Sequence, residues 1–128
     1  MMIADTDVLI DYLQGKGKTA DRIALELEHA QLYTTAVTRF ELLAGAKSAR
    51  QEKLVTQLLE ALPCLPLDSA AADHAAAVRR TLEKQGQAIG MGDSLIAGIT
   101  LANKGMLLTR NRRHFERVPG LSLGTLHD

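Results

Sequence analysis

Apolar residues follow two patterns along this 128-residue chain, short uninterrupted runs and longer stripes with helical spacing. Short runs are typical of buried β-strands, whereas apolar residues at intervals of three and four indicate amphipathic helices. Ala20, Ile23, Ala24 and Leu27 form one such helical stripe. Strands are predicted at 1–4, 31–35, 64–67, 106–108 and, weakly, 121–126, and helices at about 6–13, 20–27, 38–45, 54–62, 68–86 and 94–102.

This alternation of strands and helices predicts an α/β fold in which helices cover both faces of a parallel sheet of four to five short strands. The predicted three-layer α/β/α domain spans residues 1–128, a length that buries a core without disulfides. Aromatic residues make up only 3% of the chain, so aliphatic side chains must build that core. Cys64 lies in an apolar stretch and is expected to be a small core residue. The stripe at 54–62 is expected either in the core or on a dimer face.

Charge and composition exclude several classes of protein. Fifteen basic and fifteen acidic side chains cancel, so any nucleic-acid binding must come from a local patch. No apolar segment is long enough to cross a membrane, no signal peptide is evident, and a lone cysteine fits a reducing compartment. We therefore expect a cytoplasmic protein with no membrane partner. A basic patch, or simply a solvated basic tail, lies at Lys104, Arg110, Arg112, Arg113 and Arg117.

Four polar residues mark the points where apolar segments give way to helical ones: Asp5, Glu41, Asp93 and Asn111. Joints after parallel strands open on one edge of a sheet, so residues remote in sequence can meet there. Each residue also has a purely structural interpretation. Asp5 and Asn111 suit helix caps, Glu41 would complete a capping box with Thr38, and the helix dipole favours Asp93.

A metal site is the alternative that explains these acids together. Asp93 precedes the most apolar helix, where a charge needs partners, and clustered carboxylates repel one another unless a cation is present. Asp5, Glu41 and Asp93 are oxygen ligands with no accompanying His or Cys cluster, which favours Mg²⁺ or Mn²⁺ over Zn²⁺. His114 is expected to have a surface role.

Four strings follow one another along the chain, at residues 3–10, 38–42, 92–97 and 108–120. Together and in this order, they resemble the PIN domain, and more narrowly the VapC toxins of bacterial toxin–antitoxin pairs. The resemblance implies that Asp5, Glu41 and Asp93 bind the metal and that Asn111 takes the family's fourth polar position. Asn111 stands where many relatives have Asp, and Asp7, a further candidate ligand, where Asn is common.

The resemblance implies a Mg²⁺- or Mn²⁺-dependent endoribonuclease that forms a homodimer and is neutralised by a small antitoxin whose C-terminal segment covers the active site. Asp5, Glu41, Asp93 and Asn111 would be its catalytic residues. Two alternatives stay open: a catalytically inactive binding module with the same fold, and a phosphatase that uses the Asp5-x-Asp7 pair. The residues expected to contact phosphate or RNA are Thr6, Thr109, Arg110, Arg112 and Arg113.

Overall fold

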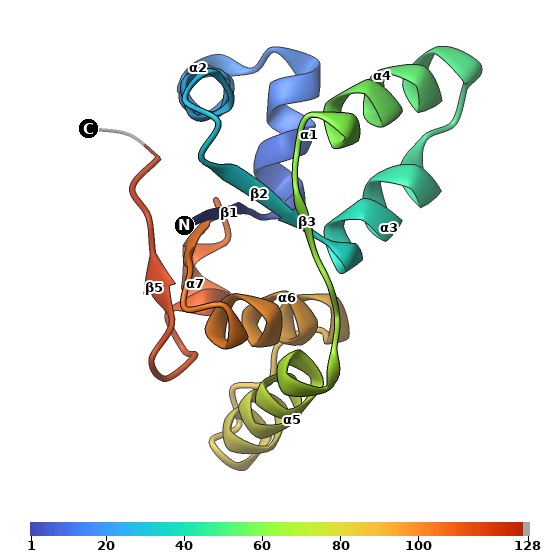
Figure 1. Cartoon of the computed structure of the whole chain (residues 1–128). Coiled ribbons are helices and arrows are strands. Elements are labelled where there is room, and N and C mark those ends of the chain that lie inside the picture. Colours follow the sequence, from blue (N-terminus) through green and yellow to red (C-terminus); the bar gives the residue numbers. More distant parts are fainter. Residues whose placement is uncertain (127–128) are drawn as a thin grey trace.

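Five short parallel strands form the centre of the computed structural model, which describes residues 1–126 (Figure 1). Their order is β3-β2-β1-β4-β5, so the first strand in sequence is the central one. The strands are β1 Met2–Ala4, β2 Leu32–Thr35, β3 Cys64–Leu65, β4 Met106–Leu108 and β5 Ser122–Leu123. The helices are α1 Thr6–Gln14, α2 Gly17–Glu28, α3 Ala36–Gly45, α4 Ala49–Glu60, α5 Ser69–Lys84, α6 Met91–Ala102 and α7 Arg112–Phe115.

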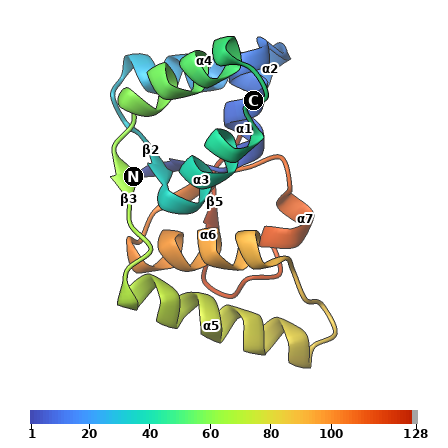
Figure 2. The same ribbon diagram turned by 90° about the vertical axis from the view of Figure 1, so that its right-hand side faces the viewer.

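Side chains on the two central strands alternate between two hydrophobic clusters. Ala4 and Leu108 are buried under α1 to α4, whereas Ile3 and Leu107 are buried under α5, α6 and α7. Successive residues of a strand point to opposite faces, which explains this division. Figures 1 and 2 show the two groups of helices on opposite sides of the sheet. The predicted three-layer α/β/α fold with a parallel sheet is thus confirmed.

Helices α5 and α6 pack closely enough to exclude a side chain. A Cβ atom added to Gly98 of α6 would lie 2.5 Å from the Ala71 carbonyl oxygen and 2.6 Å from the Ala75 Cβ. Only glycine permits this approach, since real Cβ atoms do not come so near to backbone oxygen. The contact fixes α6 against α5, and with it the first turn of α6, which carries Asp93.

Helix α3 begins two residues earlier than predicted, which changes the role expected for Glu41. Thr35 ends β2 and also caps α3, because its hydroxyl accepts the Thr38 N–H at 3.1 Å. The capping box predicted between Thr38 and Glu41 is therefore wrong. Glu41 lies in the second turn of α3, away from the helix end.

The structure tests two expectations about burial. Cys64 is exposed, so its assignment to the core was wrong; it lies on β3, a two-residue edge strand that pairs only with β2. The stripe at 54–62 belongs to the core, except that Leu54 is 41% exposed. Among residues 1–126, no helix combines the length and the hydropathy required to span a bilayer.

Candidate active site

The carboxyl ends of β1 and β4 carry the first pair of site residues. Asp5 follows β1 and Thr109 follows β4, two strands that pair directly. The Thr109 hydroxyl donates to Asp5 Oδ2 at 2.7 Å, and Asp5 Oδ1 accepts the Thr6 N–H at 2.8 Å. The sheet changes winding direction between these strands, which is where open α/β sheets place their ligands. Asp5 is therefore both a helix cap and the central carboxylate of this edge.

Burial disfavours the ionised form of the Asp5 carboxyl group. Desolvation is the main reason that the pKa of Asp5 rises to about 7, and the nearby charges of Asp7 and, to a smaller extent, Asp93 add to it. Hydrogen bonds from Thr109 and from the Thr6 backbone oppose the rise, because they favour the charged form. A carboxylate under these conditions is stabilised by a nearby cation.

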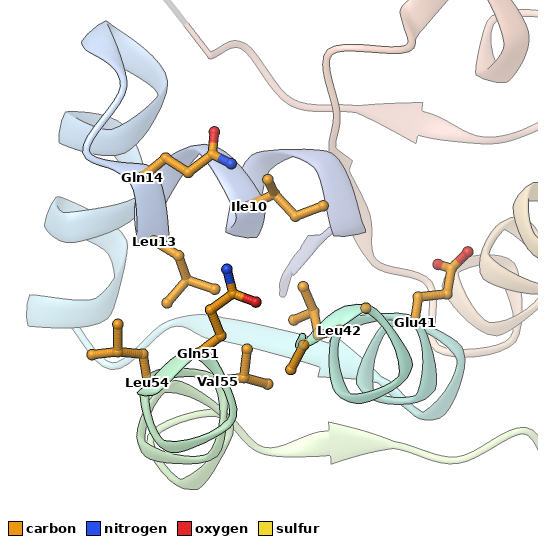
Figure 3. A pocket seen from close by; sticks show the side chains of 10 residues that line it. Ile10, Leu13, Gln14, Glu41, Leu42, Gln51, Leu54 and Val55 are labelled. Atoms are coloured by element: carbon orange, nitrogen blue, oxygen red, sulfur yellow. The ribbon is translucent and has the colours of Figure 1, made fainter. Parts of the chain in front are cut away.

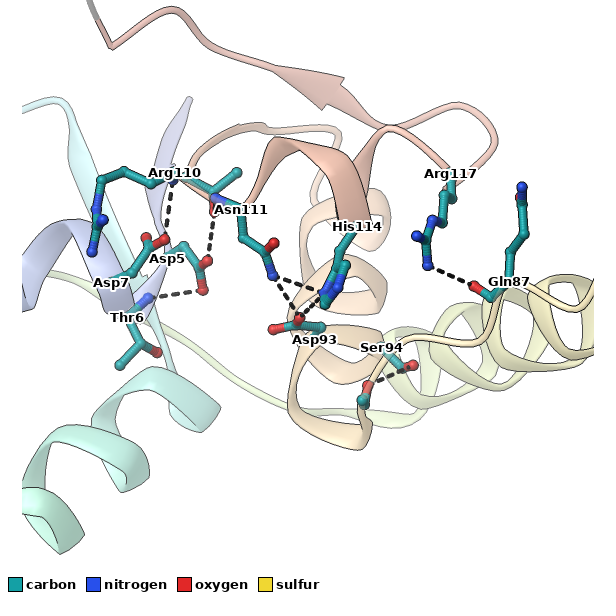
Figure 4. A network of polar contacts seen from close by, with 12 residues as sticks. Asp5, Thr6, Asp7, Gln87, Asp93, Ser94, Arg110, Asn111, His114 and Arg117 are labelled. Carbon is teal, nitrogen blue, oxygen red and sulfur yellow. Dashed lines mark hydrogen bonds and ion pairs between the residues drawn. The ribbon is translucent and has the colours of Figure 1, made fainter.

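Asn111 connects Asp93 with the edge of β4 (Figure 4). Its backbone N–H donates to the Thr109 hydroxyl at 2.9 Å, and its side-chain Nδ2 lies 3.2 Å from Asp93 Oδ2. The same Nδ2 lies 2.8 Å from Nδ1 of His114. Asn111 is the residue before α7, but its side chain makes no capping hydrogen bond to that helix. Its amide group donates to Asp93 instead.

Glu41 reaches the same edge from α3. The Thr6 hydroxyl donates to Glu41 Oε1 at 2.6 Å and lies 3.1 Å from the Thr38 hydroxyl. A Cβ added to Gly92 would lie 3.2 Å from Glu41 Oε2, which shows how close this carboxylate is to the residue before Asp93. Glu41 is exposed, in contrast to Asp5. The four predicted residues are thus brought to one edge of the sheet.

Asp7 and Arg110 hold α1 against the segment after β4. Asp7 Oδ2 accepts the Arg110 N–H at 3.1 Å, and the Arg110 guanidinium Nε lies 2.7 Å from Asp11 Oδ2, one turn further along α1. Burial raises the pKa of Asp7, while the Arg110 N–H and guanidinium lower it. Asp7 Oδ1 is buried and finds no hydrogen-bond partner in residues 1–126.

The arginines predicted to contact RNA differ in how far they are already engaged. Arg110 is paired with Asp11. Arg112 donates to the Gly124 carbonyl oxygen at 2.8 Å and lies 3.7 Å from Glu116. Arg113 is exposed on α7. The basic segment around α7 therefore borders Asp93 and Asn111, and Arg113 is its exposed cation on α7 that forms no ion pair among residues 1–126.

The chemical type of the donor atoms fits a hard divalent cation. Asp5, Asp93 and Glu41 offer only oxygen atoms, and the unpartnered Asp7 Oδ1 adds to the excess of negative charge. Within residues 1–126, no three His, Cys, Asp or Glu side chains are close enough to surround an ion by themselves. Mg²⁺ does not require that, because it keeps several waters and binds one or two carboxylates together with substrate phosphate.

An apolar groove begins beside Glu41 and runs between α1, α3 and α4 (Figure 3). It has a volume of about 390 Å³. Glu41 stands at one end, and the half-buried Leu13 and the exposed Leu54 are among the apolar side chains along it. The sequence pattern did not predict this groove.

His114 is the site residue that sequence reasoning missed. It was expected to have a plain surface role, and its side chain is indeed 41% exposed, yet it also contacts Asn111 and Asp93. Its position three residues after Asn111 at the start of a helix was the available signal, since such residues share a face.

Comparison with known proteins gives a consistent result. The family profile of the PIN domain matches residues 2–121. The tRNA(fMet)-specific endonuclease VapC of Shigella flexneri is 31% identical over 121 residues, which cover 91% of each protein. The DNA-bound VapBC structure from Salmonella typhimurium superposes with a TM-score of 0.86 at 27% identity, covering 98% of both chains. VapBC-1 from nontypeable Haemophilus influenzae gives 0.84 at 25% identity, covering 98% of this chain and 97% of that one.

Proposed function

Because the chain belongs to the PIN domain family and, within it, to the VapC-type ribonucleases, we propose that it is the metal-dependent endoribonuclease of a toxin–antitoxin pair. One observation supports the metal dependence of this proposed activity. Asp5 and Asp93 lie at one edge of the sheet and are linked through Thr109 and Asn111 by short hydrogen bonds. Helix capping explains one oxygen of Asp5 but not this connection. The family membership also removes the support for a phosphatase that uses Asp5 and Asp7.

Asp5 and Asp93 are the residues that would hold a Mg²⁺ or Mn²⁺ ion, with Glu41 as a further ligand. Such an ion supplies a Lewis acid that activates water as a nucleophile and offsets charge on the phosphate. Thr109 keeps Asp5 oriented and stabilises its ionised form. Thr6 holds Glu41 toward the same edge. Direct attack by water would leave a 5′-phosphate and a 3′-hydroxyl on the RNA.

We further propose a structured transfer RNA as the substrate. The Shigella relative is named for cleavage of tRNA(fMet). The basic segment next to Asp93 provides cations for the phosphate backbone, with Arg112 and Arg113 both exposed. Only 3% of residues are aromatic, which favours recognition of RNA shape over base stacking.

The antitoxin is the protein partner, and we propose the groove between α1, α3 and α4 as the surface that it covers. VapBC structures that resemble this chain belong to toxin–antitoxin systems. The groove is apolar along its walls and ends at Glu41, so one bound segment would fill the groove and also block the catalytic edge. We expect the toxin to form a homodimer in this complex.

RNA cleavage tests this function directly. Initiator tRNA(fMet) and total bacterial transfer RNA are incubated with the purified protein in Mg²⁺, in Mn²⁺ and in EDTA. We expect cleavage only with metal, and sequencing of the RNA ends should find 5′-phosphates. Asp93→Asn should reduce the rate by roughly a hundredfold or more, since it removes a metal ligand and a charge.

Asp73→Asn is the matched control, because Asp73 is an exposed acid on α5 and lies away from the site. It should cleave like the wild type. Undiminished cleavage by Asp93→Asn would contradict the mechanism. A chain that neither cleaves RNA nor gains thermal stability from Mn²⁺ would instead be an inactive binding module, since a bound ion stabilises the folded state.

A further inference from the structure

His114 has one ring nitrogen directed into the site and the rest of its side chain partly exposed. Nδ1 lies 2.8 Å from Nδ2 of Asn111 and 3.3 Å from Asp93 Oδ2 (Figure 4). The side chain is 41% exposed. The imidazole therefore bridges the acidic edge and the surface that an RNA strand would approach.

The contacts of Asn111 determine which ring nitrogen carries the proton. An ionised carboxylate only accepts hydrogen bonds, so the amide group that faces Asp93 must be the NH₂ and not the oxygen. That NH₂ has a second hydrogen, and Nδ1 of His114 lies 2.8 Å from its nitrogen. A proton on Nδ1 would place two donors against each other at this distance.

Nδ1 therefore accepts from Asn111 through its lone pair, and the proton of the neutral ring is on Nε2. The 3.3 Å distance between Nδ1 and Asp93 Oδ2 is then a contact and not an ion pair. It is longer than the 2.8 Å hydrogen bond from Asn111 Nδ2 to the same nitrogen. The Nδ1 edge is packed against Asn111, so the exposed part of the ring is the edge that carries the Nε2–H.

We propose that His114 binds a non-bridging phosphate oxygen of the RNA through Nε2–H, beside the phosphate that is cleaved. This inference rests on the proposed ribonuclease function. The site needs such a donor because its central groups, Asp5, Glu41 and Asp93, repel phosphate. A neutral N–H suits the position, because it attracts phosphate oxygen without forming an ion pair that would occupy Asp93.

Three substitutions separate this role from simple support of Asn111. His114→Leu removes both nitrogens. His114→Asn keeps an acceptor near the Nδ1 position but has no outward donor. His114→Gln places an amide NH₂ near the Nε2 position. Steady-state cleavage of initiator tRNA(fMet) is measured at pH 8 for each variant, and thermal unfolding checks that each is folded.

We expect His114→Leu and His114→Asn to raise KM by roughly ten- to a hundredfold, the effect of losing one hydrogen bond to a charged group. The kcat should change little, because the contact is made in both the bound substrate and the transition state. His114→Gln should restore most of the KM. In the wild type, ¹⁵N chemical shifts of the ring should show the proton on Nε2.

Three results would overturn the inference. The first is a KM close to that of the wild type in all three variants. The second is rescue by His114→Asn but not by His114→Gln, which would make His114 a support for Asn111. The third is a neutral ring with its proton on Nδ1. Absence of cleavage by the wild type would instead overturn the proposed function, and this inference with it.

Discussion

The two faces of the sheet are covered in different ways. On one face, α6 packs so closely on α5 that Gly98 has no room for a Cβ atom beside Ala71. On the other face, α1, α3 and α4 leave a groove of about 390 Å³, and α3 buries little of its own surface. Phe40 of α3 is 70% exposed. One face is a closed scaffold, and the other has apolar surface left over.

The site draws its acids from both faces. Asp93 stands on the closed side, where the position of α6 is fixed by packing. Glu41 stands on the open side, on an exposed helix next to the groove. Asp5 lies between them at the end of the central strand. The difference suggests a division of work in which the closed half sets the catalytic geometry and the open half receives the partner.

The largest expected effect concerns Asp5, where the two halves meet. The pKa of Asp5 is about 7 in the folded protein against a reference value of 3.8, so the folded protein binds more protons than the unfolded chain between these values. The contribution of Asp5 to the free energy of unfolding of the metal-free protein should therefore be largest below about pH 4. This contribution should fall by on the order of 4 kcal/mol as the pH rises to about 7.

Asp5→Asn should remove most of this fall, because Asn still caps a helix but carries no charge. Urea unfolding in EDTA at pH 5 and pH 8 measures the effect. Asp93→Asn is the comparison. Because Asp93 is only partly buried, this substitution should reduce the fall in stability less than Asp5→Asn does. An Asp5→Asn protein that is no more stable than the wild type at pH 8 would show that Asp5 is not under electrostatic stress.

The next effect tests the closed half. In Gly98→Ala the new Cβ would lie 2.5 Å from the Ala71 carbonyl oxygen, and the overpacking should cost about 2 to 3 kcal/mol of stability. The same change at Gly45 of α3 meets no atom within 4 Å and should be neutral or stabilising by up to about 1 kcal/mol. Chemical denaturation compares the two variants. Equal losses would mean that the two faces do not differ in packing.

The smallest effect on stability should come from the groove. Leu54→Asp places a charge on a partly exposed groove residue, so the free energy of unfolding should change by less than about 0.5 to 1 kcal/mol. Its affinity for the co-expressed antitoxin should nevertheless fall at least about tenfold. Leu25→Asp on α2 is the control, because Leu25 is 46% exposed and lies outside the groove. Titration calorimetry measures the affinity of both variants for the antitoxin. Equal affinities would contradict the proposal that the antitoxin binds in the groove.

The sequence predicted the sheet and the four central site residues because both depend on local patterns. Short apolar runs mark the strands, and Asp5 and Asn111 stand just after β1 and β4, whose parallel pairing brings them together. Asp93 follows no strand; it lies in the first turn of α6, and the packing of that helix brings it to the same edge. The joint after each strand is thus the most predictable part of an α/β site.

Features that depend on tertiary packing were not predictable in this way. Cys64 sits in an apolar stretch, but the strand that carries it is a two-residue edge strand, so the thiol is exposed. His114 meets an acid 21 positions earlier in the chain, a contact that no local pattern contains. The groove is likewise the space left between three separate helices.

The central claim is that Asp5 and Asp93 together hold a divalent cation. Calorimetric titration of Mn²⁺ into the RNA-free protein tests it without relying on activity. We predict saturable binding to the wild type and to Asp73→Asn, and binding at least about tenfold weaker to Asp5→Asn and to Asp93→Asn. Equal Mn²⁺ affinity in all four proteins would contradict the account.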